Sequence, residues 1–189
     1  MDFPQRPFYF VRHGQTEWNL IDRVQGQTDI PLNQTGIQQA AIAAEKAKLL
    51  PLTQIITSPL LRTLKTAAII SEAKHLPMLL DRQLIERSYG SYEGQYLDDI
   101  QRQHGLSDDG SIDRVLPSDA ETWAQLVARS HAAVEKWLTA CPNDVLLFVG
   151  HAAFFRALYE SLGGPSTGAE NGKIYHFIPH AHGWQVEEL

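Results

Sequence analysis

The sequence predicts an α/β fold with a largely parallel sheet. Short apolar runs bounded by turn residues alternate along the chain with segments whose apolar residues recur at helical spacing. Charged or titratable residues follow several of these runs directly, which is typical of parallel strands that end at a ligand-binding edge. Because 189 residues suit one domain with a substantial core, we expect a single domain over residues 1–189.

In the first half of the chain, apolar runs and helix signals alternate as this fold requires. The expected strands are 8–12, 54–57 and 78–80. A polar loop after the first strand leads to a helix from about Gly36 to Leu50, with Thr35 as its cap and Pro51 at its end. Pro59 opens a second helix, since the run LLRTLKTAAIISEAKH places apolar residues at helical spacing.

The second half of the chain begins irregularly and then returns to regular elements. Glycines mark LIERSYGSYEG as a loop, and we expect residues 95–120 to form an irregular insert with one short helix in YLDDIQRQHG. A long helix from about Glu121 to Ala140 leads to a strand at Val145–Val149. The helix AAFFRALYESL ends at Gly163, and two strand-like runs, KIYHFI and WQVEEL, meet at a turn around 179–183.

Composition and charge exclude several classes of protein. A net charge of −6 disfavours general binding to nucleic acid, which needs a basic face. The chain has no long uncharged apolar run, so we expect no membrane-spanning helix, and MDFPQRPFYF does not resemble a secretory signal. The lone cysteine, Cys141, cannot build a disulfide framework, so we expect a reducing compartment, the cytoplasm.

Four basic or titratable side chains fall where predicted strands end. Arg12 and His13 follow the first strand, Arg62 lies just beyond IITSP, and His151 follows VLLFVG. Because ligands of open α/β sheets bind at the carboxyl ends of the strands, these side chains should meet at one edge. Two arginines and two histidines, two of them near helix N-termini, predict a site for a dianion such as a phosphoryl group.

The same residues suggest a reaction. A neutral imidazole at His13 can attack phosphorus while guanidinium groups offset charge on the equatorial oxygens. Gly14 allows a tight turn in which a nearby carbonyl could hold the other ring N–H, and His151 as imidazolium would add positive charge. Glu86 is the candidate proton donor, because a bound phosphate disfavours ionisation of a neighbouring carboxyl; Glu93, in the same loop, is the other candidate.

Five sequence blocks point to a known family by their order and spacing. The chain resembles the histidine phosphatase superfamily, also called the phosphoglycerate mutase-like family, in the blocks VRHGQTEWN, QGQTDIPLNQTG, SPLLRT, LIERSYGSYEG and VGHAAFFRAL. They span about residues 8–160. The resemblance implies a three-layer α/β/α sandwich with a doubly wound, mostly parallel sheet that includes one antiparallel strand. It also implies no metal, and we expect no other cofactor.

The resemblance assigns roles to individual residues. It implies that His13 is the phosphorylated nucleophile, that Glu86 is the proton donor, and that Arg12, Arg62 and His151 complete the catalytic phosphate pocket. The remaining phosphate contacts that we expect are Asn19, Gln25, Gly26 and Ala152.

Two blocks depart from the pattern of the family. The last block often reads SHGG, whereas this chain has Gly150, His151, Ala152 and Ala153, so a serine hydroxyl and a glycine pair are missing. Backbone N–H groups at the helix start remain, and we expect them to keep the pocket functional. PSDAETW replaces a PGES-like segment, and we expect Glu121 there to have a structural role.

We expect hydrolysis of a small phosphate monoester, with inorganic phosphate as product. The segment that should cover the pocket is acidic. It carries Asp98, Asp99, Asp108, Asp109, Asp113 and Asp119 against Arg102 and Arg114. An acidic rim repels a bisphosphate, and an open pocket lets water reach phosphohistidine, so a phosphatase is favoured over a mutase. ERSYG resembles the ERHYG of the mutases, which keeps a cofactor-dependent phosphoglycerate mutase as the alternative.

Two further interpretations belong to other classes. A non-catalytic module that binds a phosphorylated ligand is one, although the expected catalytic residues are all present. A metal site at His176, His180 and His182 is the other; without a neighbouring acid or cysteine, a solvated hairpin is favoured there. The sequence specifies neither the physiological ester nor the oligomeric state.

Overall fold

The protein is built around a mixed, mostly parallel sheet. The computed structural model describes residues 3–107 and 111–189, and within them a six-stranded sheet has the order β3-β2-β4-β1-β5-β6. The strands are β1 (Phe8–Arg12), β2 (Gln54–Thr57), β3 (Met78–Leu80), β4 (Leu146–Gly150), β5 (Ile174–His180) and β6 (Gly183–Glu188). The helices are α1 (Glu17–Leu20), α2 (Gln34–Lys48), α3 (Leu61–Lys74), α4 (Leu97–Gln103), α5 (Trp123–Ala140) and α6 (Ala152–Ser161).

One strand of the sheet runs against the others. β1, β4, β2 and β3 pair in parallel, whereas β5 pairs antiparallel with both β1 and β6. β5 is therefore the single antiparallel strand that the resemblance implies. The predicted α/β class is confirmed, and β1, β2 and β3 occupy the predicted residues.

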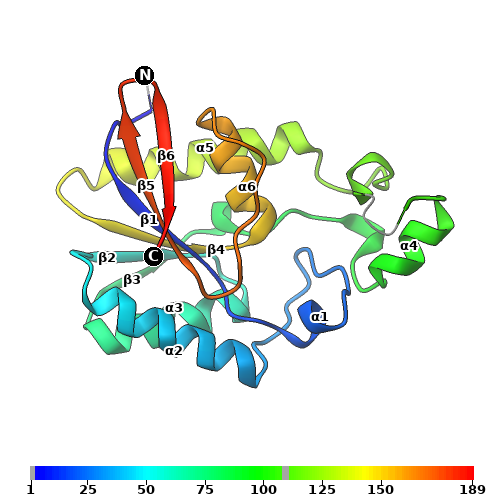
Figure 1. The fold of residues 1–189 in the computed structure, drawn as a ribbon, viewed down its shortest axis with the longest axis horizontal. Coiled ribbons are helices and arrows are strands. Elements are labelled where there is room, and N and C mark those ends of the chain that lie inside the picture. Colours follow the sequence, from blue (N-terminus) through cyan, green and yellow to red (C-terminus); the bar gives the residue numbers. More distant parts are fainter. Residues whose placement is uncertain (1–2, 108–110) are drawn as a thin grey trace.

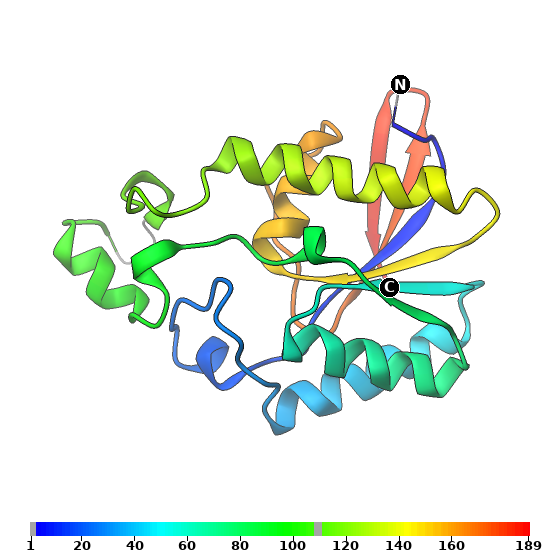
Figure 2. The same cartoon turned by 180° about the vertical axis from the view of Figure 1, so that it is seen from behind.

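Helices cover both faces of the sheet (Figures 1 and 2). α2 and α3 lie on one face, and α5 and α6 lie on the other. β1 needs cover on both faces because its residues alternate between two cores. Phe8 and Phe10 belong to the core under α5 and α6, whereas Tyr9 and Val11 belong to the core under α2 and α3. The doubly wound, three-layer α/β/α sandwich is confirmed.

Several helices begin at other residues than predicted. α2 begins at Gln34 because the Asn33 side chain accepts a hydrogen bond from the Gly36 N–H at 2.8 Å, so Thr35 lies inside the helix. α3 begins at Leu61 rather than at Pro59, and α5 begins at Trp123, after a capping box between Thr122 and Gln125. β4 ends one residue later than predicted, at Gly150.

A short helix, α1, lies in the expected polar loop after β1. Thr16 caps it, and the Asn19 side chain completes the capping box by accepting from the Thr16 N–H. Four residues are too few to show helical periodicity, so the sequence pattern could not reveal this turn. Its position matters because it holds Asn19 beside the end of β1.

The predicted insert at 95–120 stands apart from the sheet. It contains α4, as expected, and a 3-10 turn at Ile112–Arg114. Tyr92, Ile100 and Ile112 form a small apolar cluster of their own, and this part of the chain lies beyond one end of the helical layers (Figure 2). Asp108 and Asp109 fall outside the described residues. Among the helices described, none combines the length and the apolar character needed to cross a bilayer.

Candidate active site

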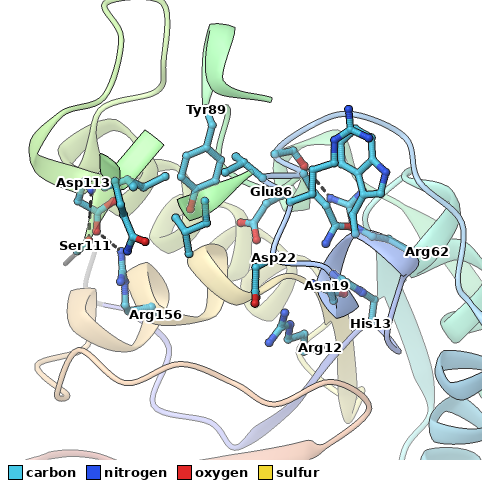
Figure 3. A pocket seen from close by; sticks show the side chains of 18 residues that line it. Arg12, His13, Asn19, Asp22, Arg62, Glu86, Tyr89, Ser111, Asp113 and Arg156 are labelled. Carbon is cyan, nitrogen blue, oxygen red and sulfur yellow. Dashed lines mark hydrogen bonds and ion pairs between the residues drawn. The ribbon is translucent and has the colours of Figure 1, made fainter. Parts of the chain in front are cut away.

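A cavity of about 430 Å³ opens where β1 ends. Seven of the nine predicted site residues line it. They are Arg12, His13, Asn19, Gln25, Gly26, Arg62 and Glu86. His151 lies just behind the wall, with its ring centroid 5.3 Å from that of His13. Ala152 is not part of the lining. Figure 3 shows His13, Arg12 and Arg62 at one end of the cavity.

The backbone and the ring of His13 are each held by a hydrogen bond. Its N–H donates to the Gly150 carbonyl at 3.0 Å, which joins the ends of β1 and β4. Its ring Nδ1 lies 2.7 Å from the Gly14 carbonyl oxygen. Because a carbonyl only accepts, Nδ1 carries the proton and Nε2 keeps its lone pair. This is the tautomer that the sequence analysis requires of a nucleophile.

Gly14 is required by the close approach of α2. A Cβ at this position would lie 2.2 Å from the Gly36 carbonyl oxygen, far inside contact distance. The turn after β1 therefore packs directly on the start of α2. This packing fixes the carbonyl that orients His13.

The two arginines are anchored by backbone carbonyls. Arg62, in the first turn of α3, is 1% exposed and donates to the carbonyls of Thr28 at 2.9 Å and Gly26 at 2.7 Å. Burial lowers the pKa of Arg62 to about 10, so it stays charged at neutral pH. Arg12 donates to the Ala169 carbonyl at 2.8 Å. The Nε atom of each arginine is buried without a partner in the described part of the chain.

His151 is fully buried immediately before α6. Its Nε2 lies 2.8 Å from the Ser58 hydroxyl, and its Nδ1 has no partner among the described residues. Burial, with Arg62 as the next cause, lowers the pKa of both His151 and His13 well below the usual value of 6.5. The groups of the protein itself thus keep His151 neutral, whereas the sequence analysis expects an imidazolium. Sequence patterns do not report burial of this kind.

Glu86 occupies the N-terminus of α6. Its carboxyl accepts from the backbone N–H groups of Arg87 at 2.9 Å, Phe154 at 3.1 Å and Ala153 at 3.2 Å. The sequence analysis assigns the N–H groups of this helix start to phosphate. The structure instead uses Ala153 and Phe154 to fix a carboxyl, which explains why the helix start at Ala152 is absent from the cavity wall.

Glu93, the other candidate acid, has a structural position. Its carboxylate accepts from the N–H groups of Gln27 at 3.0 Å, Thr28 at 2.9 Å and Tyr89 at 3.1 Å. These bonds tie the loop at 25–28 to the loop at 84–94, and Glu93 does not line the cavity. Glu93 therefore supports the carbonyls that hold Arg62, and Glu86 is the carboxyl that faces the cavity.

Asn19 and Gln25 present amide groups to the cavity. Thr16 binds both side-chain oxygens: its N–H donates to Asn19 Oδ1 at 3.1 Å, and its hydroxyl donates to Gln25 Oε1 at 2.9 Å. With the oxygens engaged, the NH₂ groups are the donors that remain for a ligand. Both side chains are thus suited to bind anionic oxygens.

The far side of the cavity contains residues that the sequence analysis did not single out as site residues. Tyr89, Ser111, Asp113 and Arg156 line it, and Figure 3 shows the last three together across Tyr89 from His13. Arg156 lies four residues after Ala152 in α6, which is one helical turn, so its spacing from the last sequence block could have indicated it. Asp113 was predicted only as one of many acids in the cover.

The acidic cover takes a different form from the predicted rim. Of the predicted acids that the structure describes there, Asp113 lines the cavity, and its charge is paired with Arg87 and Arg156. Asp99 binds Arg102 at 2.5 Å on the surface instead. Among the residues described, no group of three His, Cys, Asp or Glu side chains is arranged to hold a metal ion.

Comparison with known proteins identifies the family. A family model described as the histidine phosphatase superfamily (branch 1) matches residues 8–189. The chain belongs to the histidine phosphatase superfamily. The chain is 39% identical over 154 residues to a protein named uncharacterized phosphatase PhoE from Bacillus subtilis, a match that covers 82% of this chain and 76% of the relative.

Other similar proteins carry the names of both activities considered above, phosphoglycerate mutase and phosphatase. A probable phosphoglycerate mutase GpmB from Cronobacter sakazakii is 36% identical over 166 residues, covering 86% of this chain and 77% of the relative. Among solved structures, a mycobacterial glucosyl-3-phosphoglycerate phosphatase in complex with VO3 superimposes with a TM-score of 0.83 at 26% identity, covering 97% of this chain and 98% of that chain.

Proposed function

We propose that the protein is a metal-independent phosphatase that hydrolyses small phosphate monoesters through a phosphohistidine on His13. The observation that carries this proposal is a set of buried nitrogens around that ring that have no partner within residues 3–107 and 111–189: Arg12 Nε, Arg62 Nε and His151 Nδ1. A buried donor left unpaired costs about 1–3 kcal/mol. One phosphoryl group supplies oxygens for all three, which come from separate elements of the fold.

In the first step, His13 Nε2 attacks phosphorus. The bond from Nε2 to phosphorus forms as the bond from phosphorus to the ester oxygen breaks, and the leaving oxygen takes a proton from Glu86. Arg12 and Arg62 offset the negative charge on the phosphoryl oxygens during the transfer, so fixed guanidinium groups supply positive charge in this step. The Gly14 carbonyl keeps the ring in the tautomer that attack requires.

In the second step, water hydrolyses the phosphohistidine. Glu86 accepts a proton from the attacking water as the bond from Nε2 to phosphorus breaks, which releases inorganic phosphate and returns His13 to its neutral form. The backbone donors of α6 hold this carboxyl in place through both transfers. A bound dianion next to His151 favours a proton on its Nδ1, which supplies the positive charge that the protein groups alone withhold.

Three observations support hydrolysis at a small ester. A relative is named a phosphatase, a similar structure is a phosphatase in complex with VO3, and the acid in the described cover already neutralises the nearby arginines. A phosphoglycerate mutase must hold a second strong anion, for which those arginines would have to be available. The relatives named probable phosphoglycerate mutase keep this activity as the second candidate. The lone Cys141 favours a cytoplasmic location.

Two assays on one preparation test the proposal. We expect the wild-type protein to release phosphate from p-nitrophenyl phosphate faster than it isomerises 3-phosphoglycerate in the presence of 2,3-bisphosphoglycerate. His13→Ala should lower phosphate release by about 10³-fold or more. His182→Ala, at an exposed turn, is the matched control and should retain wild-type rates. Faster isomerisation would identify a mutase. Phosphate binding without turnover on a broad panel of esters would identify a binding module.

A further inference from the structure

The distal end of the cavity is defined as Tyr89, Ser111, Ile112, Asp113 and Arg156. It lies beyond Glu86 from His13, where the leaving group of a phosphate ester would extend (Figure 3). Its role as a site for the alcohol part of the ester rests on the proposed function.

Asp113 is the central charge of the distal end. One carboxylate oxygen binds Arg87, and the other binds Arg156 at 2.7 Å. Burial opposes ionisation of Asp113, but the two arginines outweigh burial and lower its pKa, so the carboxylate is charged at neutral pH. Each of its oxygens therefore already holds a guanidinium group.

The two arginines are fixed in place by more than Asp113. Their guanidinium carbons lie 4.2 Å (Arg156) and 5.4 Å (Arg87) from the ring of Trp123. Arg87 is 1% exposed, and its Nε also donates to the Glu121 carbonyl at 2.9 Å. If Asp113 lost its charge, Arg156, which lines the cavity, would face it without an anion, and the buried Arg87 would lose its carboxylate partner.

The remaining groups suit neutral hydroxyls. The Tyr89 phenol has a raised pKa because it is buried and near Glu86, so it remains a donor. The Ser111 hydroxyl accepts from the Asp113 N–H at 3.2 Å, and its hydrogen bond with the Asp113 carboxylate helps to lower the pKa of that group. Arg156 Nε is buried without a partner in the described chain. Ile112 adds an apolar surface for carbon atoms.

We propose that Asp113 determines leaving-group selectivity. By neutralising Arg87 and Arg156, it makes the distal end accept the phosphate ester of a neutral, polyhydroxylated alcohol of the sugar or polyol class, and reject an ester with a second anionic group. A second anion gains little from guanidinium groups that are already paired, and it meets the Asp113 carboxylate at close range. Asp22 and Arg23, which also line the cavity, are sequence neighbours of opposite sign.

Two substrates with one carbon skeleton test this proposal. Glycerol 3-phosphate and 3-phosphoglycerate differ in a neutral CH₂OH against a carboxylate, so the ratio of their kcat/KM values for phosphate release reports the charge preference alone. We expect wild type to prefer glycerol 3-phosphate by about 10-fold or more. Asp113→Asn should lower this ratio by about 10-fold or more, because Arg156 then faces the cavity without its anion and Arg87 adds uncompensated positive charge next to it.

A second variant makes the test independent of the first. Arg156→Gln removes one cation and keeps Asp113 with Arg87, so the ratio should rise by about 10-fold. Asp99→Asn is the matched control: it makes the same change in the same insert, at the exposed pair with Arg102, and should leave the ratio unchanged.

The outcomes separate this proposal from the proposed function. If Asp113→Asn or Arg156→Gln turns over p-nitrophenyl phosphate but keeps the wild-type ratio, the charge proposal is wrong. If Asp113→Asn does not fold, the Arg156→Gln ratio decides. If wild type releases phosphate from no ester, including p-nitrophenyl phosphate, the proposed function itself is wrong.

Discussion

The two ends of the cavity are built in different ways. At the end of the cavity around His13, called the phosphate end below, side chains come from the ends of β1 and β4 and from the first turn of α3, and three of their nitrogens are buried without partners in the part of the chain that the structure describes. At the distal end, an ion cluster around Asp113 joins the insert to α6, and its carboxylate oxygens are already bound. The sheet edge thus supplies a fixed site for the phosphoryl group, which all phosphate esters share. The ion pairs at the distal end instead shape the region for the alcohol part, which differs between esters.

Substitution of Glu86, which lies between the two ends of the cavity, should have the largest effect on activity. Glu86→Gln keeps the size of the side chain but removes the proton that the leaving oxygen needs. We expect kcat/KM for phosphate release, which reports the first step, to fall by about 10²–10⁴-fold for an alkyl ester such as glycerol 3-phosphate and much less for p-nitrophenyl phosphate, because nitrophenolate leaves without protonation.

Glu93→Gln is the matched control for that substitution. Glu93 binds backbone N–H groups of two loops and does not line the cavity, so its loss should lower both rates by a similar factor. Equal losses for both esters in Glu86→Gln would contradict proton donation by Glu86.

A substitution in the turn after β1, which positions His13, should have a smaller effect, and this effect should be on stability. Gly14→Ala places a Cβ 2.2 Å from the Gly36 carbonyl, so β1 and α2 must separate. We expect the free energy of unfolding to fall by about 1–3 kcal/mol in urea titration. Gly105→Ala, in the insert, is the comparison: it has open space, so the only cost is its positive φ, and the loss should be smaller. An unchanged stability in Gly14→Ala would contradict the packing described for this turn.

A pH dependence of stability between pH 7 and pH 5 should distinguish the phosphate end from the distal end. The folded chain lowers the pKa of His13 and His151, so between their unfolded value near 6.5 and the lower folded values, the unfolded chain binds protons that the folded chain excludes. The free energy of unfolding should therefore be level above pH 7 and fall toward pH 5, by at most about 1.4 kcal/mol per pH unit for each histidine.

The distal end provides the contrast. The pKa of Asp113 is lowered from 3.8, so its stabilising contribution is present above that pH and is lost only as the pH falls further. His151→Asn should show a shallower fall between pH 6.5 and pH 5 in thermal unfolding. A slope equal to that of wild type would show that His151 is not held neutral by the fold.

The regular elements near the phosphate end could be predicted because their signals are local. Residues 8–11 are an unbroken buried run, and Gly14 marks the turn that follows β1, so both the strand and the position of His13 follow from the sequence. The start of α2 was misplaced because Asn33 and Thr35 are both good caps, and only the bond from Gly36 identifies the first of them.

The parts that could not be predicted depend on contacts between distant segments. Glu86 binds the N-terminus of α6, 67 and 68 residues further along the chain, so no local pattern shows that its carboxyl takes the N–H groups expected for phosphate. Asp113 and Arg156 are 43 residues apart, and counting charges in the insert gave the acid without its partners. Burial of His151, which removes its charge, is likewise a property of the assembled fold.

Trapping the phosphohistidine intermediate tests directly whether His13 is the nucleophile. The wild-type protein should be mixed with p-nitrophenyl phosphate, quenched in alkali within one turnover, and digested for mass spectrometry. The account predicts one acid-labile phosphoryl group on His13, absent from His13→Ala. Turnover with no phosphorylated residue, or with the phosphoryl group on any other side chain, would contradict it.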